Sequence, residues 1–330
     1  ITNEQMGALA NLQQNSTKFN EELAKLQSEL ADKDFSIGGL NTRQNRKVQE
    51  GNQKIFQTSL ANIEKNMADT PELIYDGPFA DQMINRKPVG LEGKNVSEAE
   101  AQKIAREFFG ANRVEGIETF EEGEHASEVR IPSYTFSLTP KDTSRQLAVH
   151  MGVSKKGGHV LWMNNPRAIN SKAKITIEEA QNRALTYLGE KGFDNMEPNY
   201  YNKYNGGVLF NFVNKEKDVT IYPDLIKVKV ALDNGEIVGF DASAYYLNHH
   251  NRNIEEPKLS LEEARERVKT DFDVNSSRLA LIPKGKNELL CYEFKGNYRG
   301  ADYIVYINAL TGSEEQILQI IKDENGTLTF

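Results

Sequence analysis

The feature that most constrains this sequence is a short phrase that occurs three times in the same register. Each copy has an apolar residue, then Ser or Thr, then a stretch rich in Glu that ends in Ala. The copies are Val96–Ala101, Ile175–Ala180 and Leu259–Ala264. They begin roughly 80 residues apart, which makes them an internal repeat rather than a chance match.

Each copy of the phrase predicts the start of a helix of a few turns. A Ser or Thr at the N-cap accepts a hydrogen bond from an orphan N–H, and a Glu three residues later can bond back to the N–H of the cap. The predicted caps are Ser97, Thr176 and Ser260, and their partners are Glu100, Glu179 and Glu263. These residues recur once per repeat, whereas an active site usually occurs once in a chain. We therefore interpret them as structural helix caps.

The chain after each phrase is typical of antiparallel strands joined by tight turns. Short runs rich in Val, Ile, Tyr and Phe are separated by Gly and Asn, and each repeat has a turn glycine near its end. The turn glycines are Gly157, Gly235 and Gly312. The predicted strands are 116–121, 128–138, 147–153 and 159–163, then 200–204, 208–213, 226–232 and 236–245, then 279–282, 288–294, 303–307 and 315–321.

These patterns predict an α+β fold: an N-terminal α-helical hairpin or bundle fragment, then three tandem repeats, each with one helix packed on an antiparallel β-sheet. The predicted regions are a helical region 1–70, an ordered connector 71–93, and repeats 94–170, 171–253 and 254–330. In the helical region two apolar stripes at heptad-like spacing flank a Gly-containing loop. The stripes either pack on each other or dock on a partner or on a part of the protein upstream of residue 1.

The repeats resemble PepSY domains. The third fits best, with the hairpin Val305–Gly312, whereas the first departs most, having Ala99 where the others carry Glu and Lys156-Gly157 at its turn. The order of parts is similar to that of the YpeB family of spore germination proteins: a helical region, then the connector Leu73–Phe79, then three such units. One PepSY phrase is only modestly specific, but this order of parts is much more so.

The resemblance implies a function and a partner. The family is thought to hold and protect a cortex-lytic enzyme of the SleB type until germination, and PepSY domains also occur in propeptides of secreted metalloproteases. It further implies a place on the outer face of the inner spore membrane, on the cortex side, with an N-terminal membrane anchor that is missing here. We expect the fragment itself to be soluble.

A catalytic function is the less favoured alternative. A cell-wall hydrolase needs one or two well-placed carboxylates, and the candidates without a repeat equivalent are Glu121, Glu124 and Glu128 near His125. Their clustering could raise one pKa, but an exposed hairpin tip explains them better. No His-Glu-x-x-His motif is present, Ser154 misses the Gly-x-Ser-x-Gly pattern, and Cys291 lies in a strand pattern. We therefore expect no catalytic residue, no cofactor and no metal, including at the adjacent His249 and His250.

The remaining expectations concern other partners. A net charge of −8 argues against a nucleic-acid partner, and no apolar run approaches the ~20 residues that cross a bilayer. Peptidoglycan binding is a second alternative, because aromatic side chains could stack on sugars. The aromatic candidates are Trp162, Tyr200, Tyr201, Tyr204, Tyr245 and Tyr246. Their frequency in strands is the simpler explanation.

Overall fold

The computed structural model describes residues 79, 88–120, 131–141, 147–324 and 326–329, all within one compact unit, Asp76–Phe330. The predicted helical region 1–70 and most of the connector lie outside the described residues. So do Glu121, Glu124, His125 and Glu128.

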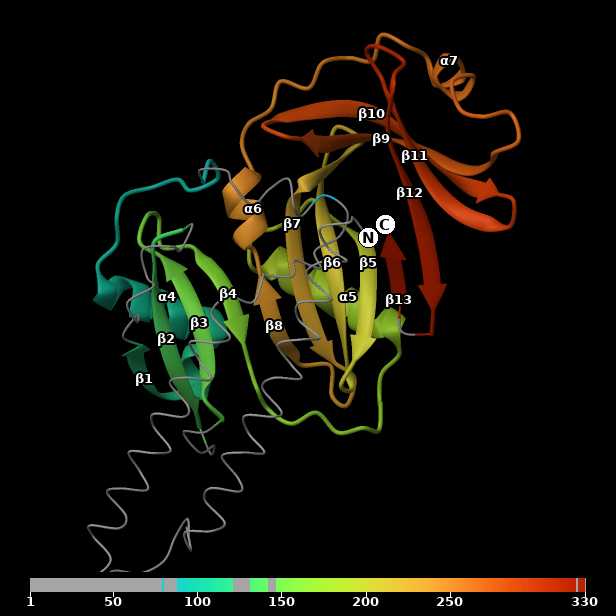
Figure 1. Ribbon diagram of the computed structural model, residues 1–330. Coiled ribbons are helices and arrows are strands. Elements are labelled where there is room, and N and C mark those ends of the chain that lie inside the picture. Colours follow the sequence, from blue (N-terminus) through green and yellow to red (C-terminus); the bar gives the residue numbers. More distant parts are fainter. Residues whose placement is uncertain (1–78, 80–87, 121–130, 142–146, 325, 330) are drawn as a thin grey trace, which may run out of the picture. The chain divides into compact units, whose positions relative to one another are not determined.

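Thirteen strands of the described part form one sheet (Figure 1). The strands are β1 Val114–Phe120, β2 Ser133–Pro140, β3 Val149–Ser154, β4 Val160–Asn164, β5 Met196–Tyr204, β6 Gly207–Glu216, β7 Val219–Ala231, β8 Ile237–Asp241, β9 Asp273–Lys284, β10 Asn287–Tyr298, β11 Ala301–Asn308, β12 Glu314–Asp323 and β13 Gly326–Thr329. Their order is β1-β2-β3-β4-β8-β7-β6-β5-β13-β12-β11-β10-β9. The sheet is therefore mixed by a single pairing: β7 and β9 run parallel, and the pairs in the order above are antiparallel.

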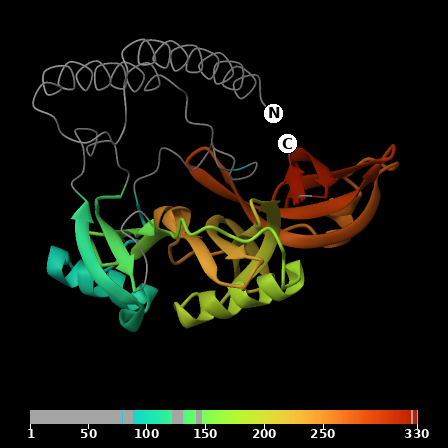
Figure 2. The same ribbon diagram turned by 90° about the horizontal axis from the view of Figure 1, so that it is seen from below.

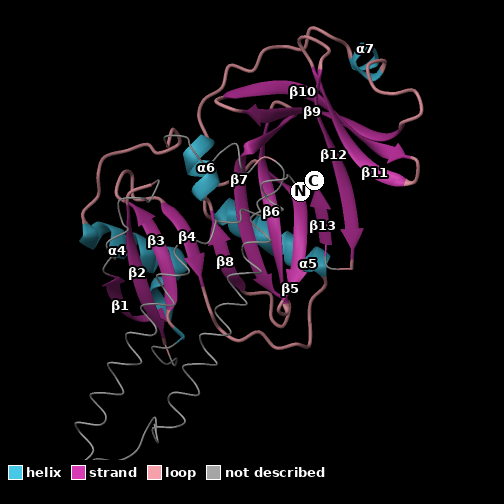
Figure 3. Cartoon of the chain, viewed as in Figure 1, coloured by secondary structure: helices cyan, strands magenta, loops and turns pink. Residues whose placement is uncertain are grey.

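Helices occupy few of the described residues (Figure 3). They are α4 Glu98–Phe109, the 3-10 turn η1 Ala111–Arg113, α5 Ile177–Glu190, α6 Ser243–Asn248 and α7 Leu261–Arg265. Each of α4, α5 and α7 precedes at least four strands along the chain. Figure 2 shows α4 and α5 on the same side of the sheet, where each buries residues four apart along one stripe.

The sequence prediction is wrong about the sheet, because the strands of all three repeats form one sheet with a parallel β7–β9 pairing instead of a separate antiparallel sheet in each repeat. It is also wrong at two elements. The predicted strand 236–245 ends at Asp241, whose carboxylate accepts the N–H of Ser243 at 2.9 Å and turns the chain into α6. The third helix, expected to run a few turns, is regular for five residues only. From Arg267 on its bonds are of the i→i+3 type, as from the N–H of Val268 to the carbonyl of Arg265, which tightens the backbone.

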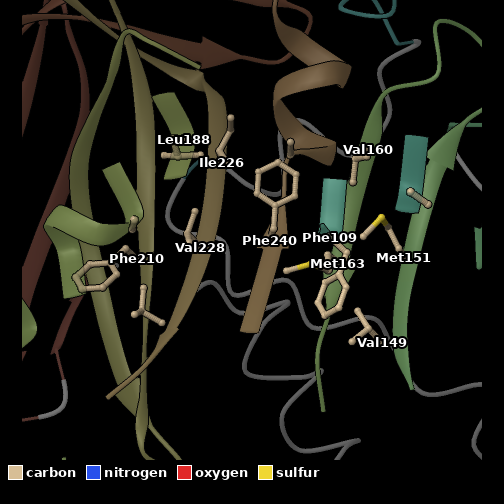
Figure 4. Close-up of a cluster of buried hydrophobic side chains, with 14 of the residues drawn as sticks. Phe109, Val149, Met151, Val160, Met163, Leu188, Phe210, Ile226, Val228 and Phe240 are labelled. Atoms are coloured by element: carbon tan, nitrogen blue, oxygen red, sulfur yellow. The ribbon is translucent and has the colours of Figure 1, made fainter. Parts of the chain in front are cut away.

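The core is divided into clusters that do not follow the repeat boundaries. The largest takes residues from both the first and the second repeat, including Phe109, Met163 and Phe240 (Figure 4). A second lies under α7 and takes most of its residues from the third repeat, together with Val219 and Ile221 of β7 from the second. A third joins strands of the second and third repeats and includes Phe79, whose ring lies 5.1 Å from that of Tyr222 and 5.6 Å from that of Tyr306. Phe79 is the one described residue of the predicted connector before position 88, and it is buried.

Candidate functional site

All three recurring phrases form capping boxes at the start of a helix. The N–H of the Glu donates to the cap hydroxyl at 3.4 Å for Ser97, 3.1 Å for Thr176 and 3.2 Å for Ser260. In return each cap N–H donates to its Glu carboxylate at 2.7 Å. The bond from the cap N–H also lowers the pKa of Glu100 and of Glu263. The carboxylates are therefore engaged at the caps.

The cap and the turn glycine of each repeat lie against each other. The backbone just before the cap bonds to the hairpin: Val96 N–H to the Lys155 carbonyl at 2.8 Å, Lys174 N–H to Leu232 at 2.8 Å, and Lys258 N–H to Ala309 at 3.0 Å. The turn glycines have positive φ, and at Gly157 a Cβ atom would lie 2.0 Å from the carbonyl oxygen of Glu92. Two sequence signals roughly 55 residues apart thus form one structural unit, repeated three times.

Charged side chains gather where the first repeat meets the second. Arg167, from the linking segment, donates to Asp233 at 2.9 Å and to Glu236 at 2.6 Å, and Arg113 of η1 also binds Glu236. The hydrogen bond from Arg167 lowers the pKa of Asp233 to about 2. The hairpin of the second repeat is thereby fixed to the preceding repeat.

An open pocket of about 410 Å³ lies beside this cluster. Phe109, Pro140 and Leu147 give it an apolar wall, and Arg113, Arg167 and Glu236 lie at its polar side. These three charged groups already bind one another, so the pocket offers shape and apolar contact more than free charge.

A buried ion network joins the second repeat to the third. Asp224 of β7 is fully buried and accepts two hydrogen bonds from Arg252, at 2.8 and 2.9 Å. Arg252 also donates to Glu288 of β10 at 2.8 Å, and the ring of His249 lies 2.6 Å from Asp224. The guanidinium therefore connects two strands that belong to different repeats.

A second buried carboxylate is that of Glu293 in β10. It accepts hydrogen bonds from the hydroxyls of Tyr222 and Tyr306 and, at 2.9 Å, from Arg278. Arg278 also binds Glu197 of β5 at 2.9 Å. Burial acts to raise the pKa of Glu293, but the positive charges of Arg278 and Lys295 and the two hydroxyls outweigh it, so the pKa lies below its ordinary value. Glu293 is therefore a charged, fully bonded structural group.

Sequence reasoning missed both buried networks. The available signal for Glu293 was its place between Tyr292 and Phe294 in a strand, on the same face as the buried Cys291. Arg252 had no signal, because it lies in a polar run typical of a surface loop.

The other residues considered for chemistry are held in structural contacts. Burial raises the pKa of the Cys291 thiol to about 12. The Ser154 hydroxyl donates to the Lys156 carbonyl at 2.7 Å and accepts the His159 N–H at 2.9 Å. His250 binds the Asn248 carbonyl at 2.8 Å. No group of three or more His, Cys, Asp and Glu side chains in the described part could hold a metal ion. No helix found there is long and apolar enough to cross a bilayer.

The aromatic candidates for sugar stacking pack against more than one cluster: Tyr201, Tyr245 and Tyr246 against the largest, and Tyr200 against the third. Tyr201 packs on Phe210, Tyr245 stacks on His249, and Tyr246 stacks on His159. Tyr204 is the most exposed of the six, and its ring lies 4.0 Å from the Lys229 ammonium. The six rings therefore do not share one stacking platform.

Comparison with known proteins gives a consistent result. The family model described as YpeB sporulation, PepSY1 and PepSY2 domains matches residues 56–255, and that described as peptidase propeptide and YPEB domain matches residues 258–318.

Individual relatives agree with the family models. The chain is similar to "Sporulation protein YpeB" of Halalkalibacterium halodurans, at 36% identity over 69% of this chain and 49% of the relative, and to that of Bacillus subtilis, at 34% over 69% and 50%. The chain spans about half the length of these curated relatives. The solved Bacillus megaterium YpeB C-terminal domain is 33% identical, with a TM-score of 0.59 over 70% of this chain and 100% of that one.

Proposed function

The chain belongs to the YpeB sporulation protein family, and from this membership we propose that it is a non-catalytic spore germination protein. In this proposal it binds, localises and restrains a cortex-lytic enzyme of the SleB type in the dormant spore. It acts at the outer face of the inner spore membrane and supports breakdown of cortex peptidoglycan on germination.

The domain type supports a restraining role. The model that matches residues 258–318 is described as common to peptidase propeptides and YPEB. A propeptide is a polypeptide that accompanies an enzyme before the enzyme acts. We extend this role to the present chain, with a lytic enzyme in place of a peptidase.

The observation that best supports the proposal is the pairing of the buried charged groups. Asp224 and Glu293 are each held by an arginine, Arg252 and Arg278, and by further hydrogen bonds. A general acid needs a proton to give, whereas the pKa of Glu293 lies below its ordinary value. These groups fix adjoining repeats to each other, so what the chain contributes is a stable contact surface.

The test mixes the purified chain with a purified SleB-type enzyme and cortex peptidoglycan. We expect a complex by size-exclusion chromatography with light scattering, and slower release of reducing ends by the enzyme when the chain is present. The chain alone should release neither muropeptides nor reducing ends between about pH 5 and pH 8, the range in which carboxylic and imidazole acids work.

Three outcomes would contradict the proposal. Release by the chain alone that disappears in Glu124→Gln would show an enzyme. Binding to purified peptidoglycan sacculi without binding to the enzyme would favour the glycan-binding alternative. Absence of a complex at micromolar concentrations would leave the restraining role without a basis.

A further inference from the structure

The third repeat exposes a position that is buried in the first two. Met163, Phe240 and Ile317 are equivalent by strand register, because they lie opposite Met151, Val228 and Val305, each 12 residues earlier in the chain (163 − 151, 240 − 228, 317 − 305). The exposed fractions are 4% for Met163 and 3% for Phe240, but 47% for Ile317. Ile321, further along β12, is 44% exposed.

The difference follows from what covers each strand. In the second repeat Phe240 packs against Phe108 of α4, at 5.2 Å between ring centroids, and against Phe193 at 6.0 Å. It is covered because β4 pairs with β8, which brings two helices side by side. In the third repeat β12 pairs with β11 and β13 instead. There α7 packs on β10, and β11 separates β10 from β12.

The exposed side chains form one face with two tyrosines. Ile317 lies directly opposite Val305, which belongs to the cluster under α7, so both point to that side of the sheet. Ile321 and Tyr303 share this side by strand alternation. Tyr303 in turn lies 6.4 Å from Tyr298 between ring centroids. We call Tyr298, Tyr303, Ile317 and Ile321 the β12 face.

Cations border the β12 face at its tyrosine end. The Lys269 ammonium lies 5.5 Å and the Arg299 guanidinium 5.1 Å from the centre of the Tyr298 ring. Neither forms an ion pair with a carboxylate in the described part of the chain. The nearby Asp302 is already bound by Lys322 at 3.1 Å. An acidic partner therefore finds complementary charge here.

The geometry points to an amphipathic helix with an acidic flank, carried by a partner protein, as the occupant of the β12 face. Ile317 and Ile321 are four residues apart on a strand, which corresponds to a spacing of about 13 Å. Side chains at positions i and i+8 of a helix are about 12 Å apart and match this spacing. The equivalent position at Phe240 is itself covered by a helix, through Phe108 and with Ile104 one turn earlier. This inference rests on the proposed function for the identity of the partner, which is the lytic enzyme.

The first test uses synthetic helical peptides of about 18 residues with Leu at i, i+4, i+8 and i+11 and with Glu, Gln or Lys on the flanks. We expect the Glu-flanked peptide to bind at least tenfold tighter than the Lys-flanked one by fluorescence anisotropy. Ile317→Gln combined with Ile321→Gln should weaken binding at least tenfold, whereas Val89→Gln, at another exposed apolar residue, should not. Lys269→Gln combined with Arg299→Gln should abolish the preference for Glu over Gln flanks.

Equal binding of the Glu-flanked peptide to the wild type and to the isoleucine double variant would overturn the inference, and so would no binding to the wild type. Sedimentation provides a further outcome: a dimer of the wild type that the double variant dissociates would make a second copy of this chain the occupant.

The second test repeats the binding assay with the purified lytic enzyme. Binding to the wild type and tenfold weaker binding to the double variant would support the inference. Equal binding to both would refute it and leave the proposed function intact. No binding to the wild type would refute the proposed function, and the peptide assay would still decide the chemistry of the β12 face.

Discussion

At the scale of single residues, the hydroxyl of each N-cap satisfies one backbone N–H that the helix cannot. Because the three caps have the same geometry, removing any of them should have a similar effect. We expect Ser260→Ala to lower the free energy of unfolding by about 1 kcal/mol, and Thr176→Ala to do the same. Thr176→Ser, which keeps the hydroxyl, is the control. Loss of partner binding in Ser260→Ala at unchanged melting temperature would show that this residue belongs to a binding surface instead.

A second prediction at this scale concerns pH. The hydrogen bond from Arg167 lowers the pKa of Asp233 from 3.8 to about 2. A lowered carboxyl pKa stabilises the fold at pH values above the unfolded pKa, and this stabilisation is lost as the pH falls through the folded pKa. The difference in unfolding free energy between the wild type and Asp233→Asn should therefore be constant near neutral pH and shrink from about pH 4 to pH 2.

Urea denaturation at several pH values measures this difference. Asp218→Asn is the control, because Asp218 is 95% exposed and its salt bridge is with Lys215, three residues away. A gap between wild type and Asp233→Asn that persists unchanged at pH 2 would contradict the assignment of the effect to ionised Asp233.

At the scale of elements, Arg252 ties β7 to β10 through Asp224 and Glu288. Removing one partner leaves a carboxylate buried without its counter-charge, which typically costs about 3–5 kcal/mol. We expect Arg252→Ala to lower the free energy of unfolding by that amount, measured by chemical denaturation. Lys103→Ala removes an exposed pair with Glu107 at 3.9 Å and should cost under about 0.5 kcal/mol. Similar costs for both variants would mean that water reaches Asp224.

How much of these elements the sequence could predict depends on whether a signal is local. Caps, turn glycines and alternating strands are local, so the starts of α4, α5 and α7 and most strand positions follow from the sequence. The tyrosines at 245 and 246 favour a strand by propensity, but the turn made by Asp241 places them in α6. Strand β13 and the parallel β7–β9 pairing depend on contacts between repeats. The same holds for Arg252, whose partners are 28 and 36 residues away.

At the scale of the whole described unit, the repeats differ from those of a linear solenoid. In a solenoid each repeat contacts its neighbours through limited interfaces, and stability is approximately a sum over repeats. Here β4 pairs with β8, and the largest hydrophobic cluster is common to the first and second repeats. Two repeats that share one core have no separate cores to unfold independently.

The last prediction tests this shared core. Phe240 of β8 contacts Phe108 of α4 and Tyr187 of α5, so Phe240→Ala removes packing from both repeats and should cost about 3–5 kcal/mol. Hydrogen exchange should then show that amides in α4 and α5 lose protection together, although Phe240 belongs to the second repeat only. The control is Val268→Ala in the cluster under α7, which should reduce protection in β10 and β11 before α4. If α5 lost protection in Phe240→Ala while α4 kept it, the two repeats would be independent folding units, and the continuous sheet would join them without coupling their stabilities.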